Sequence, residues 1–406
     1  TIRNFSANED CLNTVKAFRQ LGVKITNLKE RSLVVFGRGL LDISNSKRSI
    51  FVGESGTTLR LLLGVLAGQN FEVTLSAGKS LSKRPMLRVT MPLRLMGAQI
   101  SAERKARSGK SEEYPPITIR GGKLKAITYK MPVASAQVKS ALLLAGLYAE
   151  GTTQVIESVK TRDHTERMLK LFGADLTAQR NKIAVKRNNR LNSPGQIYIP
   201  GDISSASFFI VLAAICLDSQ ILLKNAGLNP LRIGIIKVLR RMGAIIKVTS
   251  HQSPVTGGEP MGDIEVKSSK LKGTVVKKNE IPSLIDELPI LMVAACFAQG
   301  RTVFKGVEEL RVKETDRIKS MCFNLEKMGA DIKVIKAAGL EQIVIQGGKE
   351  LSGANLKSFG DHRTAMSMIV AGLRARGVSR IDDITCINKS FPDFLSILGK
   401  RMRPCV

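Results

Sequence analysis

The amino-acid sequence predicts an α/β protein in two lobes of similar design, each built from three repeats that mix strands and helices. Two observations predict this fold class. A pattern of an apolar residue, a glycine and a small residue recurs along the chain, with its glycines 70 to 86 residues apart. A helix-period segment precedes the pattern, and a β-like run follows it. The glycines are Gly22, Gly97, Gly173, Gly243 and Gly329, with a weaker sixth copy at Gly399.

The length of these repeats indicates a layered α/β architecture. Solenoid units are usually about 20–50 residues long, which is shorter than this spacing. Three copies fall before Pro200-Gly201 and three after, so we place the boundary between the lobes near residues 195–203. Helix–glycine–strand connections are common in α/β proteins, and chance recurrence is the alternative. The regular spacing favours true repeats.

The elements around each glycine follow from its expected conformation. A glycine just past the end of a helix adopts the left-handed conformation and turns the chain into the next strand. The expected helices are Met86–Leu95, Arg167–Phe172 and Leu231–Met242. The expected strands are Gln99–Ala102, Asp175–Ala178, Ile245–Val248 and Asp331–Ile335.

Several apolar helices are expected to begin at small or acidic polar residues. Helix capping explains such residues, and Glu166 would complete a capping box with Asp163. The functional alternative is that these helix N-termini offer free N–H groups and partial positive charge to anions. The residues are Ser135, Asp163, Ser204, Asp286 and Asp361.

Three short segments concentrate charge or small residues. Arg311–Arg317 packs three cations and two acids into seven positions, with Lys313 and Arg317 four apart on one expected helix face. This segment is either a solvated surface helix or an anion clamp with an embedded acid–base group. Ser82–Met86 places cations before a helix opened by proline. Gly53–Arg60 is a small-residue turn entering a helix, which lets backbone approach a ligand closely.

The charge balance narrows the function. The chain has 406 residues, with 63 Lys and Arg against 34 Asp and Glu, and a formal net charge of +29. Such an excess suits nucleic acid or small polyanionic substrates. Trp is absent, Tyr numbers four, and the basic residues are spread along the whole chain. Stacking platforms for bases are therefore scarce, and we favour small anions over nucleic acid.

Membrane, secretory and zinc-binding classes find no support in the sequence. The longest apolar runs, Phe208–Leu217 and Leu288–Ala298, are shorter than the roughly 18 residues of a membrane helix. The polar opening Thr1–Asp10 is unlike a signal peptide. Six scattered Cys without a CxxC pair, and three His, leave little material for a metal site. We expect a cytoplasmic protein with reduced, semi-buried cysteines.

Eight segments together resemble the enolpyruvyl transferases, most closely the 5-enolpyruvylshikimate-3-phosphate (EPSP) synthase family and its class II, glyphosate-tolerant branch. They come in family order and span nearly the whole chain. They are Ser82–Met86, Met131–Ser140, Thr161–Glu166, Gly201-Asp202, Ile285–Glu287, Glu309–Arg317, Asp361–Arg363 and Lys389–Pro392.

The resemblance implies a fold and a reaction. The family fold is an inside-out α/β barrel in two lobes, each with three βαβαββ units whose helix N-termini face a cleft. Residues 1–200 would form the upper lobe, with a truncated start, and residues 201–406 the lower lobe, lacking the family's N-terminal strand. In the family reaction the 5-hydroxyl of shikimate 3-phosphate adds to C2 of phosphoenolpyruvate while C3 is protonated. The adduct then eliminates phosphate, and no metal or organic cofactor is implied.

Site residues carry over by position from this resemblance. Asp286 would be the base near the 5-hydroxyl, Glu314 would handle the proton at C3, and Lys313 would assist. A carboxyl beside Lys313 ionises easily, so a proton-donor role for Glu314 requires a pKa raised by burial or substrate charge. The implied phosphoenolpyruvate ligands are Gly56, Arg84, Gln137, Lys313, Arg317, Arg363 and Lys389. The implied shikimate 3-phosphate ligands are Ser135, Ala136, Gln137, Arg162, Asp286 and Lys313.

The sequence departs from the family at two places. The motif Pro-Gly-(Ser/Asp)-Lys-Ser followed by Arg supplies both substrates with ligands and belongs upstream of these segments, and the chain does not contain it. We therefore expect a few tens of residues before Thr1, or a separately supplied segment, and weak or no turnover from the chain as written. Gly56 stands where the tolerant branch carries Ala, which predicts ordinary glyphosate sensitivity.

Two alternatives remain open at this point. The sister activity on UDP-N-acetylglucosamine usually goes with a Cys shortly before the Arg-Pro pair, and Gly78–Lys83 contains none. A pseudoenzyme or a nucleic-acid-binding α/β protein would account for the charge and the missing motif. We expect a monomer that binds shikimate 3-phosphate and phosphoenolpyruvate, takes glyphosate as an inhibitor, and has neither a membrane nor a nucleic-acid partner.

Overall fold

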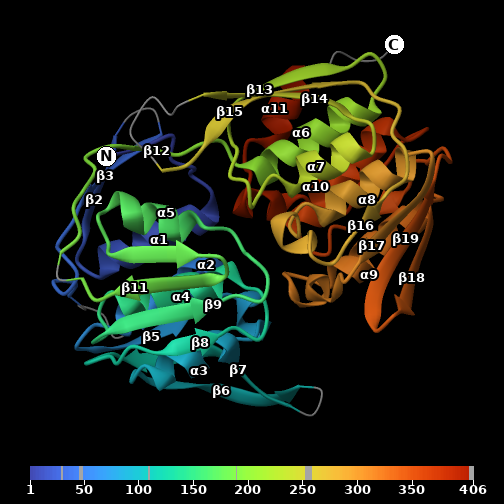
Figure 1. The fold of residues 1–406 in the computed structure, drawn as a ribbon. Helices are drawn as coiled ribbons and strands as arrows, with labels where there is room; N and C mark the ends of the chain where they lie inside the picture. Colours follow the sequence, from blue (N-terminus) through green and yellow to red (C-terminus); the bar gives the residue numbers. More distant parts are fainter. Residues whose placement is uncertain (29–30, 45–48, 108–109, 189, 252–257, 402–406) are drawn as a thin grey trace. The chain divides into compact units, whose positions relative to one another are not determined.

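The computed structural model describes residues 1–28, 31–44, 49–107, 110–188, 190–251 and 258–401 (Figure 1). The chain divides into two compact units. Unit 1 comprises Thr1–Ile199 with Ser253–Glu259, and unit 2 comprises Pro200–Gln252 with Pro260–Val406. Each unit mixes helices and sheets, as the predicted fold class requires.

Unit 1 carries helices on three small sheets. Its helices are α1 (Glu9–Gln20), α2 (Gly56–Leu66), the short 3-10 turn η1 (Leu81–Lys83), α3 (Leu87–Leu95), α4 (Ala136–Gly146) and α5 (His164–Leu171). Its strands are β1 (Ile2–Arg3), β2 (Lys24–Leu28), β3 (Ser32–Phe36), β4 (Ser49–Phe51), β5 (Glu72–Ser76), β6 (Gln99–Arg107), β7 (Lys110–Arg120), β8 (Thr128–Lys130), β9 (Thr152–Ile156), β10 (Leu176–Gln179), β11 (Lys182–Lys186) and β12 (Ile197–Tyr198).

Unit 2 follows the same alternation. Its helical segments are α6 (Ile203–Ile215), α7 (Gly234–Arg241), η2 (Ile281–Ser283), α8 (Leu288–Phe297), η3 (Glu308–Val312), α9 (Arg317–Lys327), α10 (His362–Arg374), η4 (Thr385–Lys389) and α11 (Phe394–Arg401). Its strands are β13 (Gln220–Gly227), β14 (Ile245–His251), β15 (Met261–Lys267), β16 (Val275–Val276), β17 (Gly300–Lys305), β18 (Asp331–Ala337), β19 (Leu340–Gly347), β20 (Asn355–Leu356) and β21 (Arg380–Ile381).

The sheets confirm the expected βαβαββ plan. In β4-β5-β7-β6, β8-β9-β11-β10 and β16-β17-β19-β18, the first two strands are parallel and the last two form an antiparallel hairpin. One helix joins the parallel strands, as a crossover must, and a second helix leads into the hairpin. The sheet β12-β1-β3-β2 has the same pattern, with its parallel partner taken from the far end of unit 1.

The repeat glycines adopt the predicted backbone conformation. Gly22, Gly97, Gly173, Gly243 and Gly329 follow α1, α3, α5, α7 and α9 with φ between 78° and 111°. A side chain at these φ values is strained, so glycine is favoured where the helix turns into its strand. The weaker sixth copy is wrong. Gly399 lies inside α11, because the helix continues through it to Arg401.

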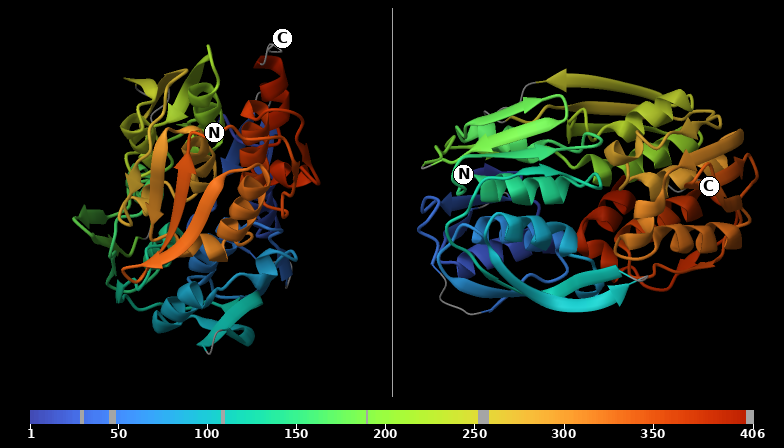
Figure 2. Two further views of the ribbon diagram at one scale, coloured as in Figure 1. Left: turned by 90° about the vertical axis from the view of Figure 1, so that its right-hand side faces the viewer. Right: turned by 60° about the horizontal axis from the view of Figure 1, so that its bottom comes forward.

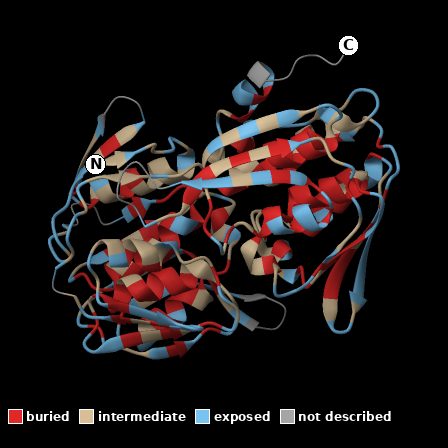
Figure 3. Ribbon diagram, turned by 45° about the horizontal axis from the view of Figure 1, so that its top comes forward, coloured by how far each residue is buried: buried red, intermediate tan, exposed pale blue. Residues whose placement is uncertain are grey.

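The helices form the interior of each unit. In unit 2, α6 and α8 are apolar on all sides and pack against each other and α10, while the sheet β16–β19 lies over one side of this helical layer (Figure 2). A helix without a polar face is one that other elements surround. Buried residues accordingly concentrate in the helices, and strands alternate between buried and exposed positions (Figure 3).

Two helix starts differ from their sequence prediction. Asp163 precedes α5 but accepts no capping hydrogen bond, so the expected capping box is wrong; its carboxylate pairs instead with Arg167 Nε at 3.0 Å. The helix after Pro85 begins at Leu87, so the proline precedes the helix instead of opening its first turn. At α5 the carboxylate of Asp163 pairs with a side chain of the helix, and at α3 Met86 separates the proline from the first helical residue.

Three further features bear on the function classes considered above. Within the described residues, no helix is both long and apolar enough to cross a membrane. Five cysteines are free thiols, and burial raises the pKa of Cys296 and of Cys322 to about 12. Cys405 lies outside the described residues.

Candidate functional site

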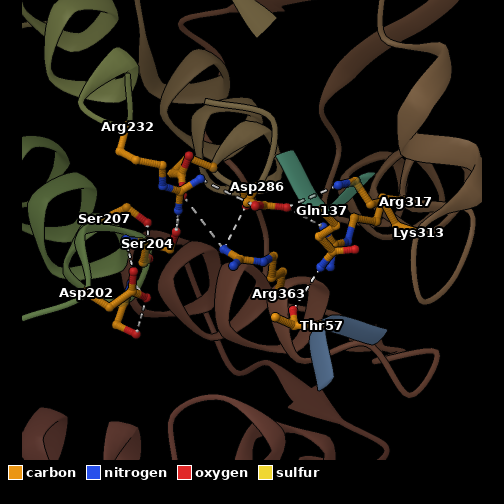
Figure 4. Close-up of polar contacts among 12 residues, drawn as sticks. Thr57, Gln137, Asp202, Ser204, Ser207, Arg232, Asp286, Lys313, Arg317 and Arg363 are labelled. Atoms are coloured by element: carbon orange, nitrogen blue, oxygen red, sulfur yellow. Dashed lines mark hydrogen bonds and ion pairs between the residues drawn. The ribbon is translucent and has the colours of Figure 1, made fainter. Parts of the chain in front are cut away.

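Asp286 is the centre of a charged cluster in unit 2 (Figure 4). It lies in the turn before α8, and its side chain is 12% exposed. Its Oδ1 lies 3.3 Å from Lys313 Nζ and 3.6 Å from Arg317 Nη1, and its Oδ2 lies 3.5 Å from Arg232 Nη1. Both carboxylate oxygens therefore face cations, a setting that favours the ionised acid.

Arg317 contacts the carboxylates of both Asp286 and Glu314, the two acids that the sequence analysis assigned to catalysis. Its side chain is 1% exposed; Nη2 donates to Glu314 Oε2 at 2.5 Å, and Nε donates to Asp361 Oδ2 at 2.9 Å. Burial opposes the charge of Arg317, but the carboxylates of Asp361, Glu314 and Asp286 outweigh it and raise the pKa of the guanidinium above its usual value. Arg317 thus remains a cation between Asp286 and Glu314.

The segment that carries Lys313 and Glu314 is a bend between two helical elements and is not itself helical. The 3-10 turn η3 ends at Val312, Lys313 has β-like dihedrals, and α9 begins only at Arg317, capped by Asp316. The prediction that Lys313 and Arg317 share one helix face is therefore wrong. They still converge, because both side chains reach Asp286 Oδ1.

Arg311 holds the segment Lys313–Asp316 in place from its N-terminal side. Its guanidinium donates to both oxygens of Glu341 on β19, with Nε at 2.9 Å from Oε2, and Nη1 lies 2.6 Å from Asp316 Oδ2. A bidentate pair of this kind adds directional constraint as well as attraction. Arg311 therefore ties the residue that caps α9 to β19, and Lys313 and Glu314 lie between these two anchor points.

The start of α10 supplies further cations. Asp361 caps this helix through the backbone N–H groups of Arg363 and Thr364, at 2.8 and 3.2 Å. Arg363 Nη1 donates to the backbone carbonyl of Asp286 at 2.9 Å, and Lys389 Nζ donates to that of Gly360 at 3.4 Å. The predicted unit 2 residues Asp286, Lys313, Glu314, Arg317 and Arg363 are thus joined by direct contacts.

His362, the first residue of α10, is a neutral neighbour of this cluster. Burial lowers the pKa of the imidazole to about 4, with Arg363 and Arg317 acting in the same direction. The ring is therefore uncharged at neutral pH and adds no further positive charge beside the two arginines.

Unit 1 gathers a second set of predicted residues around Arg60. Arg60 Nη1 donates to Gln137 Oε1 at 2.7 Å, and Gln137 Nε2 donates to Thr57 Oγ1 at 2.8 Å. Gly56 opens α2 directly beneath: a Cβ there would lie 2.9 Å from Nη1 of both Arg60 and Arg84. The two guanidinium groups therefore occupy the space that only glycine leaves open.

The start of α4 carries the predicted Ser135, Ala136 and Gln137. Ser135 caps the helix by accepting from Val138 N at 3.4 Å, so capping accounts for one of its contacts. Arg162, the remaining predicted residue, follows Thr161, whose carbonyl accepts from the buried Lys139 Nζ at 3.4 Å. Lys139 belongs to α4, so this bond ties the Arg162 segment to the helix that carries the other predicted ligands.

Lys139 also pairs with two buried carboxylates. Its Nζ lies 2.6 Å from Glu166 Oε1 and 3.2 Å from Glu157 Oε2, and all three side chains are at most 7% exposed. Burial raises the pKa of Glu166, against the opposing charge of Lys139 and with a contribution from Glu157. The cluster holds one cation against two acids beside the expected shikimate 3-phosphate ligands.

Lys139→Met is expected to lower the free energy of unfolding by about 3 kcal/mol, because two buried carboxylates lose the cation that they share. The loss should grow with pH. A Glu whose folded pKa lies above its unfolded value stabilises the fold below the unfolded pKa and loses this contribution as pH rises through the folded pKa. Urea unfolding near pH 5 and near pH 8 measures both effects.

Lys170→Met is the matched control for this prediction, because Lys170 is an exposed lysine of α5. It should change stability by less than about 0.5 kcal/mol at either pH. An equal loss for Lys139→Met at both pH values would show that Glu166 does not take up the proton.

Sequence reasoning gave no role to Arg60 and Thr57, although both lie in the Gly53–Arg60 segment, and it missed Arg232, Glu157 and Glu341. Arg60 carried a signal, since it is a cation one helical turn after the glycine that opens α2. Thr57 and Arg232 carried none, because a threonine in a first turn and an arginine after a proline are ordinary. In the described residues, no group of three or more His, Cys, Asp or Glu side chains is arranged to hold a metal ion.

Comparison with known proteins assigns the family. The sequence profile of EPSP synthase (3-phosphoshikimate 1-carboxyvinyltransferase) matches residues 1–398. The chain belongs to the EPSP synthase family. Two relatives described as 3-phosphoshikimate 1-carboxyvinyltransferase are similar: that of Desulforamulus reducens is 46% identical over 397 residues, and that of Desulforudis audaxviator 47% over 396. These matches cover 98% of this chain and 90% and 89% of the relatives.

A solved EPSP synthase supports the family fold. The structure of EPSP synthase from Acinetobacter baumannii matches with a TM-score of 0.84 and 42% sequence identity, over 98% of this chain and 89% of that one. The predicted two-lobe fold of this family is therefore confirmed.

Proposed function

We propose that Asp286 is the base and Glu314 the acid of the reaction that this chain catalyses, in which the enolpyruvyl group of phosphoenolpyruvate is transferred to the 5-hydroxyl of shikimate 3-phosphate. Membership of the EPSP synthase family gives the reaction. Arg317 contacts both residues, Asp286 through Nη1 at 3.6 Å and Glu314 through Nη2 at 2.5 Å, which supports placing the two acids in one site. A single buried cation thus fixes both acids relative to one another.

The reaction runs in two steps. In the addition, the 5-hydroxyl oxygen bonds to C2 of phosphoenolpyruvate, its proton passes to Asp286, and C3 takes a proton from Glu314. In the elimination, C3 returns its proton to Glu314 and the bond from C2 to the phosphate oxygen breaks, which restores the double bond. The leaving phosphate takes up the proton that Asp286 received, so both acids return to their starting state. Lys313, beside Asp286, neutralises charge on the reacting groups.

The remaining roles divide by charge. We assign Arg84, Gly56, Gln137, Lys313, Arg317, Arg363 and Lys389 to phosphoenolpyruvate, whose carboxylate and phosphate suit guanidinium and ammonium groups. We assign Ser135, Ala136, Gln137, Arg162, Asp286 and Lys313 to shikimate 3-phosphate. Arg60 joins the first set, since it holds Gln137 and lies against Gly56.

Glu314→Gln tests the acid role. The amide keeps the shape of the side chain but cannot deliver a proton, so kcat should fall by about 100- to 1000-fold with KM for both substrates nearly unchanged. Phosphate release measures turnover, here and in the tests below on the chain supplied with the family's upstream motif, because weak or no turnover is expected without it. Loss of the C3 proton of phosphoenolpyruvate to deuterated water, followed by NMR, measures proton transfer. Glu326→Gln, on the exposed side of α9, is the control. Unchanged proton exchange in Glu314→Gln would contradict the assignment.

We also propose that glyphosate inhibits this chain at the phosphoenolpyruvate ligands. Gly56 leaves the space next to Arg60 and Arg84 open, whereas a Cβ there would press on both guanidinium groups at 2.9 Å. Gly56→Ala should raise the glyphosate concentration for half inhibition by about tenfold or more and raise KM for phosphoenolpyruvate by less. A titration at fixed phosphoenolpyruvate measures this. Millimolar tolerance of the unsubstituted chain would contradict the proposal.

The proposal also covers the cellular location, the oligomeric state and the two lobes. We propose a cytoplasmic monomer that acts on these two small anions, with residues 1–200 and 201–406 as the two family lobes. Size-exclusion chromatography with light scattering checks the oligomeric state. The +29 charge supports faster arrival of anionic substrates, an effect that added salt should weaken.

A further inference from the structure

Arg232 is a buried arginine that contacts Asp286 at Oδ2, the carboxylate oxygen that Lys313 and Arg317 do not contact. It lies in the turn between β13 and α7, where Leu231 N donates to Asn229 Oδ1 at 2.9 Å and Arg232 N donates to Asn229 O at 2.8 Å. Its side chain is 6% exposed. Nη1 lies 3.5 Å from Asp286 Oδ2, and Nη2 lies 3.3 Å from Glu287 Oε1 (Figure 4).

The far side of the Arg232 guanidinium is fixed by a buried network. Arg232 Nη2 also donates to Ser204 Oγ, and Ser204 Oγ donates to Glu287 Oε1. Glu287 is fully buried and forms an ion pair with Arg232, so each of the two buried groups has the other as its partner. Opposing its own burial, Glu287 and Asp286 raise the pKa of Arg232 above its usual value, and the residue stays charged.

The cations on the two oxygens of Asp286 differ in what else they can bind. Lys313, which contacts Oδ1 and is 19% exposed, is assigned to phosphoenolpyruvate, so a bound phosphate or carboxylate competes with Asp286 for it. Arg317, which also contacts Oδ1, is 1% exposed and is held by Glu314 and Asp361. Arg232, which contacts Oδ2, is held by Ser204 and Glu287 and is 6% exposed, so substrate binding leaves its contact with Oδ2 in place.

We propose that Arg232 is a positioning residue that holds Oδ2 of Asp286 and leaves Oδ1 as the atom that accepts the proton of the 5-hydroxyl. This inference rests on the proposed role of Asp286. Substrate would draw Lys313 away from Oδ1, which makes that oxygen more basic at the moment when a proton arrives. Arg232 meanwhile prevents rotation of the carboxylate and keeps the acid ionised before the reaction.

The pH dependence follows from the charged groups around Asp286. Arg232, Lys313 and Arg317 face its carboxylate, and Arg363 donates to its backbone carbonyl. Glu287, Glu314 and Asp202 in turn face these cations. Removing Arg232 takes one of the cations from this set and leaves Glu287 as an added negative charge. The acid limb of the kcat profile should therefore move to higher pH, because a nearby cation favours the carboxylate form.

The test compares pH profiles of kcat. Arg232→Met should lower kcat by about 100-fold and move the acid limb upward by about one unit, with KM for both substrates unchanged within about twofold. Arg232→Lys keeps the charge but loses the two-sided contact, so kcat should fall by about tenfold with the acid limb in place. Arg240→Met is the matched control: Arg240 is an exposed arginine of α7 whose guanidinium donates to Ile246 O.

A second variant protects the test against misfolding. Arg232→Met leaves a buried carboxylate unpaired, so the double variant Arg232→Met/Glu287→Gln removes both charges and should show the same shift of the acid limb. A parent-like kcat and profile in the double variant, or a parent-like kcat in Arg232→Lys, overturns the inference. Turnover by Asp286→Asn separates a failure of this inference from a failure of the proposed role of Asp286. If that variant is active, the proposed role of Asp286 as base fails. If it is inactive while the Arg232 variants are normal, only this inference fails.

Discussion

Asp286→Asn is expected to lower kcat by about 1000-fold, because the amide cannot accept the proton of the attacking hydroxyl. The substitution keeps the volume of the side chain. It also leaves Lys313, Arg317 and Arg232 without the carboxylate that faces them at 3.3 to 3.6 Å. Phosphoenolpyruvate, an anion, should therefore bind no worse than before. Steady-state phosphate release and calorimetric titration of each substrate separate the two effects.

Asp218→Asn is the control for this prediction. Asp218 is exposed in unit 2 and has a φ of 51°, a conformation that asparagine adopts readily. It should leave kcat and stability unchanged. An Asp286→Asn variant whose kcat stays within about tenfold of the parent would mean that another group accepts the proton.

Arg317→Met should affect stability and substrate binding together. The side chain is 1% exposed and pairs with Asp361, which is fully buried, so its loss leaves an uncompensated buried carboxylate. The free energy of unfolding should fall by about 3–5 kcal/mol. KM for phosphoenolpyruvate should rise by about 100-fold, because a charged hydrogen bond to a carboxylate or phosphate contributes about 1.5–3 kcal/mol.

Lys319→Met provides the matched comparison, since Lys319 is an exposed cation two residues along α9. It should change stability by no more than about 0.5 kcal/mol and leave KM alone. Urea unfolding and substrate titration measure both variants. If Arg317→Met loses stability but keeps its KM, Arg317 is a structural residue and another cation binds phosphoenolpyruvate.

The helix starts illustrate how far local sequence reaches. The sequence marked Asp286 and Asp361 alike, as acids before an apolar helix. Asp361 does cap α10 through two backbone N–H groups, whereas α8 begins without a side-chain cap and Asp286 faces cations instead. Capping joins residues two or three apart and can be read from the sequence, but partners 27 and 54 residues away, as for Lys313 and Arg232, are set by packing.

The Arg311–Arg317 segment also shows that local sequence does not determine which tertiary contacts form. Its charge density identified it, but its spacing suggested one helix, whereas the structure has the 3-10 turn η3, a bend at residues 313–315, and then α9 capped by Asp316. The bond from Arg311 to Glu341 holds that segment to a strand 30 residues further along the chain. Propensity is a weak determinant beside such a tertiary contact.

The sequence by itself determined the repeat, the conformation of its five glycines and the family, because these depend on local backbone preference and on residues in fixed order. Only the tertiary structure decided which charges meet. It brought Asp286, Glu314 and Arg317 into contact, placed Arg60 against Gly56, and buried Arg232 behind Asp286. The physical reason is that a buried charge is stable only beside a partner of opposite charge. The partners are distant in the sequence, so the packing of the helices, and not any local sequence pattern, determines which charges are paired.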